Sequence, residues 1–254
     1  MISKIYHQKQ RGALDAFVRQ HHSAVAVEDP LGGCMIALKS ANIEKWFDGR
    51  AHFIKAFGSK EPMDFRPLLD LFSASSATIA STGSWLLGRS TLADLDLVVH
   101  DVDTGRRAAD AIRHLLKSES DARLPGYWNR PYHHRRFLFR GREICVRCST
   151  PSQITEAYTR PATYLGAIFS LTCQVVDDSL GHCTPSLYLV RVETGGAAWR
   201  AGDVLPLLSS ESRHALAFGR GERLCLDGIQ AFFSDQTQAF LVCQMGAVDG
   251  IRPY

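Results

Sequence analysis

Apolar residues recur with two different periods along this chain, and the change between them divides it near residue 161. In the first part, apolar residues at helical spacing alternate with short apolar runs, which predicts an α/β order of elements. A hairpin is expected from residues 23–27 and 34–38, which flank a Pro-Leu-Gly-Gly turn. Helices are expected at residues 7–20, 42–48 and 66–72, and a further helix is expected to begin at a cap formed by Asp103 or Thr104. Strands are expected at 78–81, 95–100, 136–139 and 143–147.

The second part consists mainly of strand-like runs separated by turn residues. Regularly spaced short strands are typical of a small barrel or sandwich. The expected class is therefore α+β, with an accessory helix and hairpin region at 1–64, a core at 65–160 and a smaller β-rich domain at 161–254. Strands are predicted at 165–176, 186–192, 224–226 and 238–244, and one helix candidate lies at 209–217.

Two polar motifs interrupt the apolar pattern of the core. Gly83-Ser84 follows the first short strand, and nine residues separate Ser84 from Asp94 and Asp96, which stand in an otherwise apolar strand. Residues two apart on a strand point to one face, so the two carboxylates would repel each other unless a cation compensates them. Carboxylate oxygens suit Mg²⁺, and a Gly-Ser turn offers free N–H groups to a phosphate. The motifs together predict a site for a metal–nucleotide complex.

The spacing of these motifs resembles the signature of the polymerase-β-like nucleotidyltransferase superfamily, in which Gly-Ser precedes Asp-x-Asp on a strand. Three stretches also look like predicted nucleotidyltransferases best known from archaea, which carry a C-terminal β-rich domain: Arg140 to Glu143, Val175 to Ser179 and Thr184 to Tyr188. The resemblance implies a nucleotidyltransferase-like mixed sheet with flanking helices at 65–160 and a barrel-like domain at 161–254. It also implies an enzyme that moves a nucleoside monophosphate from a nucleoside triphosphate to a hydroxyl group and releases pyrophosphate.

The resemblance assigns roles to individual residues. Asp94 and Asp96 would hold Mg²⁺ or Mn²⁺ with a third carboxylate from a neighbouring strand, because two carboxylates rarely hold the two ions of such a site. Glu143 is the candidate for that third catalytic and metal-binding carboxylate, although the superfamily usually has Asp there. The alternatives are Asp177 and Asp178. Residues expected to contact the polyphosphate are Gly83, Ser84, Arg89, Arg136 and Arg140, with Arg135 and Arg142 as further candidates for the polyphosphate or the acceptor.

The net charge of +3 says little, but the distribution of charge says more. Residues 123–147 hold seven arginines and two histidines against one carboxylate, with Tyr127, Trp128 and Tyr132 interleaved among them. This composition suits a triphosphate or an RNA strand, and a solvated loop with an exposed hairpin face would have it as well. The acceptor hydroxyl could belong to an RNA 3′ end, a protein or a small molecule, and the basic stretch favours RNA or tRNA.

The seven cysteines are scattered, and Cys145 and Cys148 form one CxxC. Positions three apart on a strand face opposite ways, so this pair is expected to be two reduced thiols and not a zinc chelate. No apolar run approaches the length of a membrane span, and residues 1–9 lack the apolar core of a signal peptide. A cytoplasmic protein without a membrane partner is expected, and its oligomeric state is left open.

Two other functions fit the same motifs. A nucleotide- or RNA-binding module would keep the fold without turnover, which the unusual third carboxylate leaves open. The toxin component of a toxin–antitoxin pair would modify tRNA or a partner protein. Pyrophosphate release that depends on Mg²⁺ separates the enzyme from the module, and growth arrest relieved by substitution of Asp96 would mark the toxin.

Overall fold

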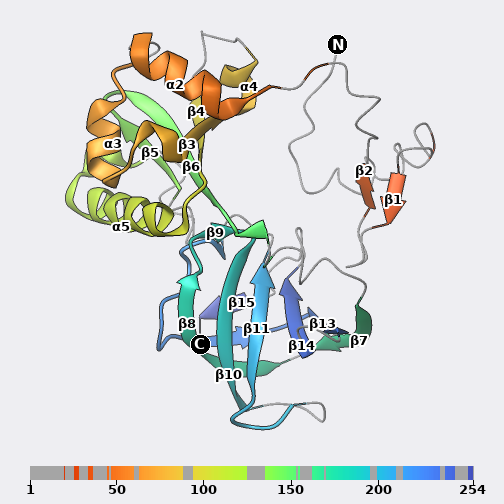
Figure 1. Ribbon diagram of the computed structural model, residues 1–254. Helices are drawn as coiled ribbons and strands as arrows, with labels where there is room; N and C mark the ends of the chain where they lie inside the picture. The colour runs from red at the N-terminus through yellow and green to blue at the C-terminus, as the bar shows by residue number, and fades with distance from the viewer. Residues whose placement is uncertain are drawn as a thin grey trace.

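The computed structural model describes residues 20, 26–28, 34–36, 45, 47–59, 63–87, 94–124, 135–152, 154, 162–168, 170–194, 199–209, 214–234, 238–243 and 251–253. These residues form an α+β structure with two mixed sheets, shown in the upper and lower parts of Figure 1. A separate pair of strands, β1 (Ala26–Glu28) and β2 (Cys34–Ile36), runs antiparallel. This confirms the pairing expected between these two segments, whereas the helix expected at 7–20 lies almost wholly outside the described residues.

The first sheet has the strand order β3-β4-β6-β5. Strands β4 and β6 run parallel, and β3 and β5 run antiparallel to their neighbours. Arg140 and Gly141 join β5 to β6 with φ angles of 51° and 75°, as a two-residue hairpin turn requires. The strands are β3 (Ile79–Thr82), β4 (Asp94–Val99), β5 (Arg136–Phe139) and β6 (Arg142–Ser149), which confirms those predicted for the core.

Helices bury one face of this sheet. Leu95, Leu97 and Val99 alternate along β4 toward that face and share a core with α3 and α5 (Figure 1). Trp85 lies in the same core, with its ring stacked on Phe65. Among the described helices, none has both the length and the apolar character needed to cross a membrane. The helices are α2 (Gly49–Ser59), α3 (Arg66–Phe72), α4 (Gly83–Leu86) and α5 (Val102–Ser118), and short 3₁₀ helices lie at Ser76–Thr78 and Ser120–Ala122.

The second sheet has eight strands in the order β15-β12-β8-β10-β11-β14-β13-β7. β11 pairs parallel with β14, and the other neighbours pair antiparallel. Within the described residues the pairing ends at β15 and β7, so the sheet is an open half-barrel and not a closed small barrel. Its strands are β7 (Thr163–Ile168), β8 (Leu171–Leu180), β10 (Ser186–Thr194), β11 (Val204–Ser209), β12 (Arg223–Leu226), β13 (Ile229–Ser234), β14 (Gln238–Cys243) and β15 (Ile251–Pro253).

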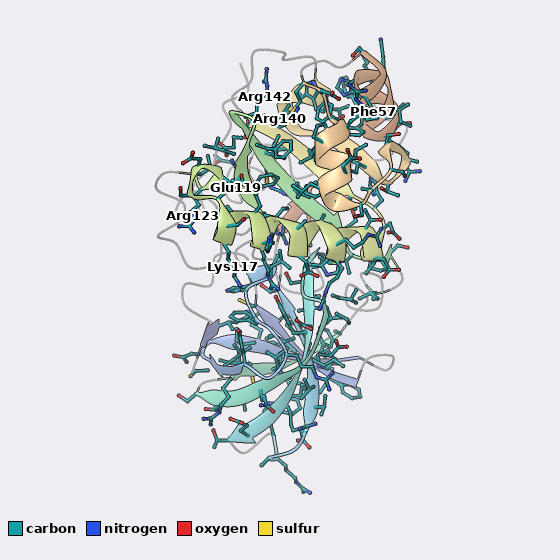
Figure 2. All side chains as sticks on the ribbon, turned by 90° about the vertical axis from the view of Figure 1, so that its left-hand side faces the viewer. Phe57, Lys117, Glu119, Arg123, Arg140 and Arg142 are labelled. Atoms are coloured by element: carbon teal, nitrogen blue, oxygen red, sulfur yellow. The ribbon has the colours of Figure 1, made fainter. Side chains whose placement is uncertain are left out.

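The two sheets are joined through α5 and β6. Strand β9 (Cys183–Thr184) belongs by sequence to the second part but pairs with the end of β6. Helix α5 lies across the boundary in Figure 2, and two of its arginines reach the second part. Arg106 Nη1 donates to the carbonyl oxygen of Asp178 at 2.8 Å, and Arg113 Nη2 donates to that of Leu216 at 2.7 Å.

Three of the predicted helix positions are wrong. Residues 45, 47 and 48 are not helical, because Asp48 accepts from the N–H groups of Arg50 and Ala51 and so begins α2 instead of ending a helix. Helix α5 is capped by Asp101, whose Oδ2 accepts from Thr104 N at 2.7 Å, and not by Asp103 or Thr104. Hydrogen bonds from the hydroxyl and the N–H of Thr104 lower the pKa of Asp101.

The third error concerns the helix candidate at 209–217. Ser209 ends β11, and residues 214–217 form a turn. Leu216 has a φ of 64°, which an α-helix does not allow. Residues 214–217 therefore form a tight turn, and Ala217 packs against the core of the second sheet.

Candidate functional site

Gly83 lies at the point where β3 turns into α4 and approaches β4 closely. Its φ is +67°, and a Cβ added there would lie 2.5 Å from Oδ2 of Asp96. The pairing of Thr82 with Asp96 in β3 and β4 fixes this approach. Glycine is required here both by the left-handed backbone and by the lack of space. The sequence therefore folds so that the Gly-Ser turn lies against the second aspartate of the motif.

Asp94 and Asp96 project from one face of β4, as their spacing predicts. Both side chains are half-buried, whereas Leu95 and Leu97 between and after them are fully buried on the other face. In the parallel pair of β4 and β6, Asp94 lies directly opposite Glu143. Residues paired in this way project from the same side of a sheet. The structure thus brings all three predicted carboxylates to one face, at the ends of β4 and β6 away from the second sheet.

Arg136 lies between two of these carboxylates. Its Nη1 is 3.6 Å from Oδ2 of Asp94 and donates a hydrogen bond to Oε1 of Glu143. The three side chains are between 22% and 30% exposed, so their charges are partly screened by solvent. The guanidinium therefore offsets the repulsion that two neighbouring carboxylates would otherwise have.

The donor set of these carboxylates fits a hard divalent cation such as Mg²⁺. In the described part of the chain their oxygens do not gather within 4.8 Å of one another, whereas one other cluster of ligating atoms does. The reason is visible at Asp94 and Glu143, where the guanidinium of Arg136 stands between the two carboxylates. A cation bound by Asp94 and Glu143 would take the place of that guanidinium.

A hollow of about 470 Å³ lies next to β3 and β4, and its lining includes Arg50, Thr82, Val98 and His100. Thr82 is paired with Asp96, and Val98 lies two residues after Asp96 in β4. Partial desolvation lowers the pKa of His100, although its side chain stays exposed, and the nearby charge of Arg50 lowers it further, so most of the imidazole is neutral at pH 7. Neither Arg50 nor His100 was predicted, because the hollow is formed by α2, which lies far from β4 in the sequence.

The other arginines that were expected to contact the polyphosphate lie in different environments. Arg140 occupies the β5–β6 turn with its guanidinium 5.9 Å from the centre of the Phe139 ring, and Figure 2 shows Arg140 and Arg142 at the end of the first sheet remote from the second. Arg135 is wrong as a phosphate contact, because it is 6% exposed and donates to the carbonyl oxygen of Cys183. Burial lowers its pKa to about 10. Arg89 and the side chain of Ser84 lie outside the described residues.

The alternative third carboxylates lie elsewhere. Asp177 and Asp178 belong to β8 in the second sheet. Asp177 accepts from the N–H and the hydroxyl of Ser179, and Asp178 lies 3.4 Å from Nη2 of Arg106. Neither reaches the face that carries Asp94, so Glu143 is the predicted third carboxylate that the fold places opposite it.

The two cysteines of the CxxC face opposite sides of β6, as strand alternation predicts. Cys145 is paired with Asp96 in the neighbouring strand, and burial raises the pKa of the Cys145 thiol. Cys148 instead contacts Cys183, with 3.8 Å between the two sulfurs, next to His182. A proton shared between these sulfurs lowers the pKa of Cys183 and raises that of Cys148. Sequence spacing could not reveal this cluster, because Cys183 follows Cys148 by 35 residues.

No protein-family model, curated protein sequence or solved structure matches the chain. Its function must therefore be inferred from the geometry of its own residues.

Proposed function

We propose that this protein is a metal-dependent nucleotidyltransferase, which moves a nucleoside monophosphate from a nucleoside triphosphate to a hydroxyl group. One observation supports this more than any other. Asp94 and Glu143 lie on directly opposed rungs of parallel strands, while the glycine turn at Gly83 lies against Asp96. A face of this kind offers carboxylates for cations and main-chain N–H groups for phosphates at adjacent positions.

Each residue has a distinct task in this proposal. Asp94, Asp96 and Glu143 would hold Mg²⁺ or Mn²⁺, which when bound neutralises phosphate charge and lowers the pKa of the attacking hydroxyl. Gly83 lets the main chain approach the outer phosphates without a side chain between them. Glu143 orients the acceptor hydroxyl and takes up its proton. Arg136, which contacts Asp94 and Glu143 here, would be free to bind a phosphate oxygen if a cation took its place between those carboxylates.

The hollow next to β3 and β4 would bind the nucleoside. Its volume of about 470 Å³ lies within the range of small-molecule sites, and its mixed apolar and polar lining suits a base and a ribose. Arg50 and the neutral His100 offer hydrogen bonds to the base or the sugar hydroxyls. The acceptor would approach from the hairpin side, where Arg140 and Arg142 lie and where an RNA backbone would be attracted.

The test is a transfer assay with each labelled nucleoside triphosphate, Mg²⁺ or Mn²⁺, and total cellular RNA and protein as acceptors. We expect labelled product and pyrophosphate with the natural sequence, and a loss of about a thousandfold or more in Asp96→Asn. Asp110→Asn is the matched control, since this aspartate is 60% exposed on α5, away from the carboxylate face. Equal activity of the two variants would contradict the proposed site.

A second function is favoured by the position of Arg136. Because its guanidinium already compensates Asp94 and Glu143, the same face could bind a nucleotide or RNA without any cation and without turnover. Tight nucleotide binding that is indifferent to Mg²⁺, with no labelled acceptor in the transfer assay, would identify this protein as such a binding module.

A further inference from the structure

Three ligating side chains meet where the two sheets join, at the opposite end of β6 from Glu143. Cys148 on β6 and Cys183 on β9 are directly paired residues of parallel strands, and His182 precedes Cys183. All three are buried, with 4% of Cys148, 3% of His182 and none of Cys183 exposed. Their ligating atoms all lie within 4.8 Å of one another. Among the residues that the structure describes, this is the one group of three or more His, Cys, Asp or Glu side chains with such close spacing.

The separations match the edges of a tetrahedral metal site. The sulfurs of Cys148 and Cys183 are 3.8 Å apart, and His182 Nε2 is 3.6 Å from the sulfur of Cys183. For tetrahedral zinc with ordinary Zn–S and Zn–N bonds, the sulfur–sulfur edge is about 3.8 Å and the sulfur–nitrogen edge about 3.6 Å. Two of the three separations therefore match the edges of a zinc site, and the third, between the sulfur of Cys148 and Nε2 of His182, is no longer than 4.8 Å.

The surroundings of His182 leave room for a fourth corner. Nε2 of His182 donates a hydrogen bond to the carbonyl oxygen of Val102 at 3.0 Å, so a zinc ion bound to Nε2 takes the place of that proton. A small cavity of about 10 Å³ borders Cys148 and His182. That volume is close to what one water molecule requires. Gly105 keeps this space open, since a Cβ there would lie 2.2 Å from the sulfur of Cys148. A main-chain oxygen or a water can thus complete the coordination.

The charge balance also suits a buried cation of this kind. Two thiolates neutralise one Zn²⁺, so the complex adds no net charge to this buried site. The guanidinium of Arg135, which donates to the carbonyl oxygen of Cys183, favours the thiolate forms of the cysteines. Soft sulfur ligands with one imidazole select zinc over Mg²⁺, which keeps this site chemically distinct from the carboxylate face.

We propose that Cys148, His182 and Cys183 bind a zinc ion that fastens β9 of the second part to β6 and the start of α5. Binding joins one zinc ion to two sulfurs and to Nε2 of His182, whose proton moves to Nδ1 of the neutral ring, and it releases the two thiol protons to solvent. The site is structural, because its three side chains are buried and the carboxylates lie at the other end of β6.

The experiment measures metal in the full-length protein, purified without a tag or a chelator. We expect about one zinc per chain by elemental mass spectrometry, and less than about a tenth of that in Cys148→Ser and Cys183→Ser. Cys173→Ser is the matched control, since Cys173 is equally buried but lies in the second sheet away from the cluster. Zinc held elsewhere, for example by other histidines, would remain in all variants and would overturn the proposal.

Cobalt replacement keeps the test decisive if a serine variant fails to fold. The natural chain, stripped of zinc and loaded with Co²⁺, should show a thiolate-to-cobalt charge-transfer band in its absorption spectrum, and so should Cys173→Ser. Removal of the metal should lower the melting temperature of the natural chain. A natural chain without zinc and without this band overturns the proposal, as does a Cys148–Cys183 disulfide, seen as the loss of two hydrogens in the joined peptides.

Discussion

The contact of Gly83 with Asp96 makes Gly83→Ala a sharp test of the carboxylate face. The new methyl group would lie 2.5 Å from Oδ2 of Asp96, and 3.3 Å from its Cβ and Cγ. Because the nearest atom is the end of a side chain, the carboxylate can give way while the backbone stays in place. It must retreat by about 0.9 Å to reach an ordinary contact distance. The substitution therefore moves one proposed ligand and leaves the fold intact.

The costs to stability and to function differ in size. An alanine at a φ of +67° costs about 1 kcal/mol relative to glycine, which lowers the melting temperature of a chain of this length by roughly 2–4 °C. Displacement of a catalytic group by about 1 Å costs on the order of a hundredfold in rate. We therefore expect a small loss of stability together with a large loss of Mg²⁺-dependent pyrophosphate release.

Gly228→Ala is a closely matched control. Gly228 has a φ of +68°, and a Cβ there meets nothing within 4 Å. It should lose about the same 1 kcal/mol of stability and keep full activity. Thermal unfolding and pyrophosphate release would be measured on both variants and on the natural chain. Similar activities in the two variants would refute the claim that Gly83 positions Asp96 for chemistry.

Three further predictions concern Arg136, Asp101 and the two histidines near the hollow. Arg136→Gln should reduce the Mg²⁺ concentration for half-maximal rate by roughly fivefold, the scale of a partly exposed ion pair, and raise KM for the triphosphate; an unchanged Mg²⁺ dependence in initial rates would contradict this. Asp101→Ala should lower the free energy of unfolding by about 1 kcal/mol in urea titrations, through loss of the cap on Thr104 N, whereas an unchanged midpoint would show that the cap is not needed. Burial lowers the pKa of both His52 and His100 in the folded chain, so the unfolded chain binds more protons and stability should fall as the pH drops through about 6.5. His100→Gln should flatten this dependence between about pH 7.5 and 5.5, and an equally steep loss of melting temperature would count against it.

The parts of the site that could be predicted from the sequence are those fixed by short-range rules. Strand alternation is enough to put Asp94 and Asp96 on one face, and the two-residue turn before β6 sets the position of Glu143 in its strand. The pairing of Glu143 with Asp94 then needs only that β6 lies beside β4. These residues could be found because each inference spans few residues.

The errors arise where distant segments decide the outcome. Arg135 stands in a basic stretch, but the arrival of β9 covers it, which no local pattern indicates. The Cys148 cluster needs the same strand, and the hollow needs α2 beside β3. The helix predicted at 42–48 is wrong at its end because Asp48, which follows apolar residues, caps the next helix instead of ending one.

The pairing of β9 with β6 means that the two halves of this protein cannot be exchanged independently. A chain ended near residue 161 would keep every carboxylate of the first sheet, yet it would leave the end of β6 and the guanidinium of Arg135 exposed to water. The second half would in turn lose the partners of Asp178 and Leu216 on α5. A different β-rich domain joined to this core would need new contacts to the end of β6, to Arg135 and to α5. The two parts are therefore expected to be inherited as one unit.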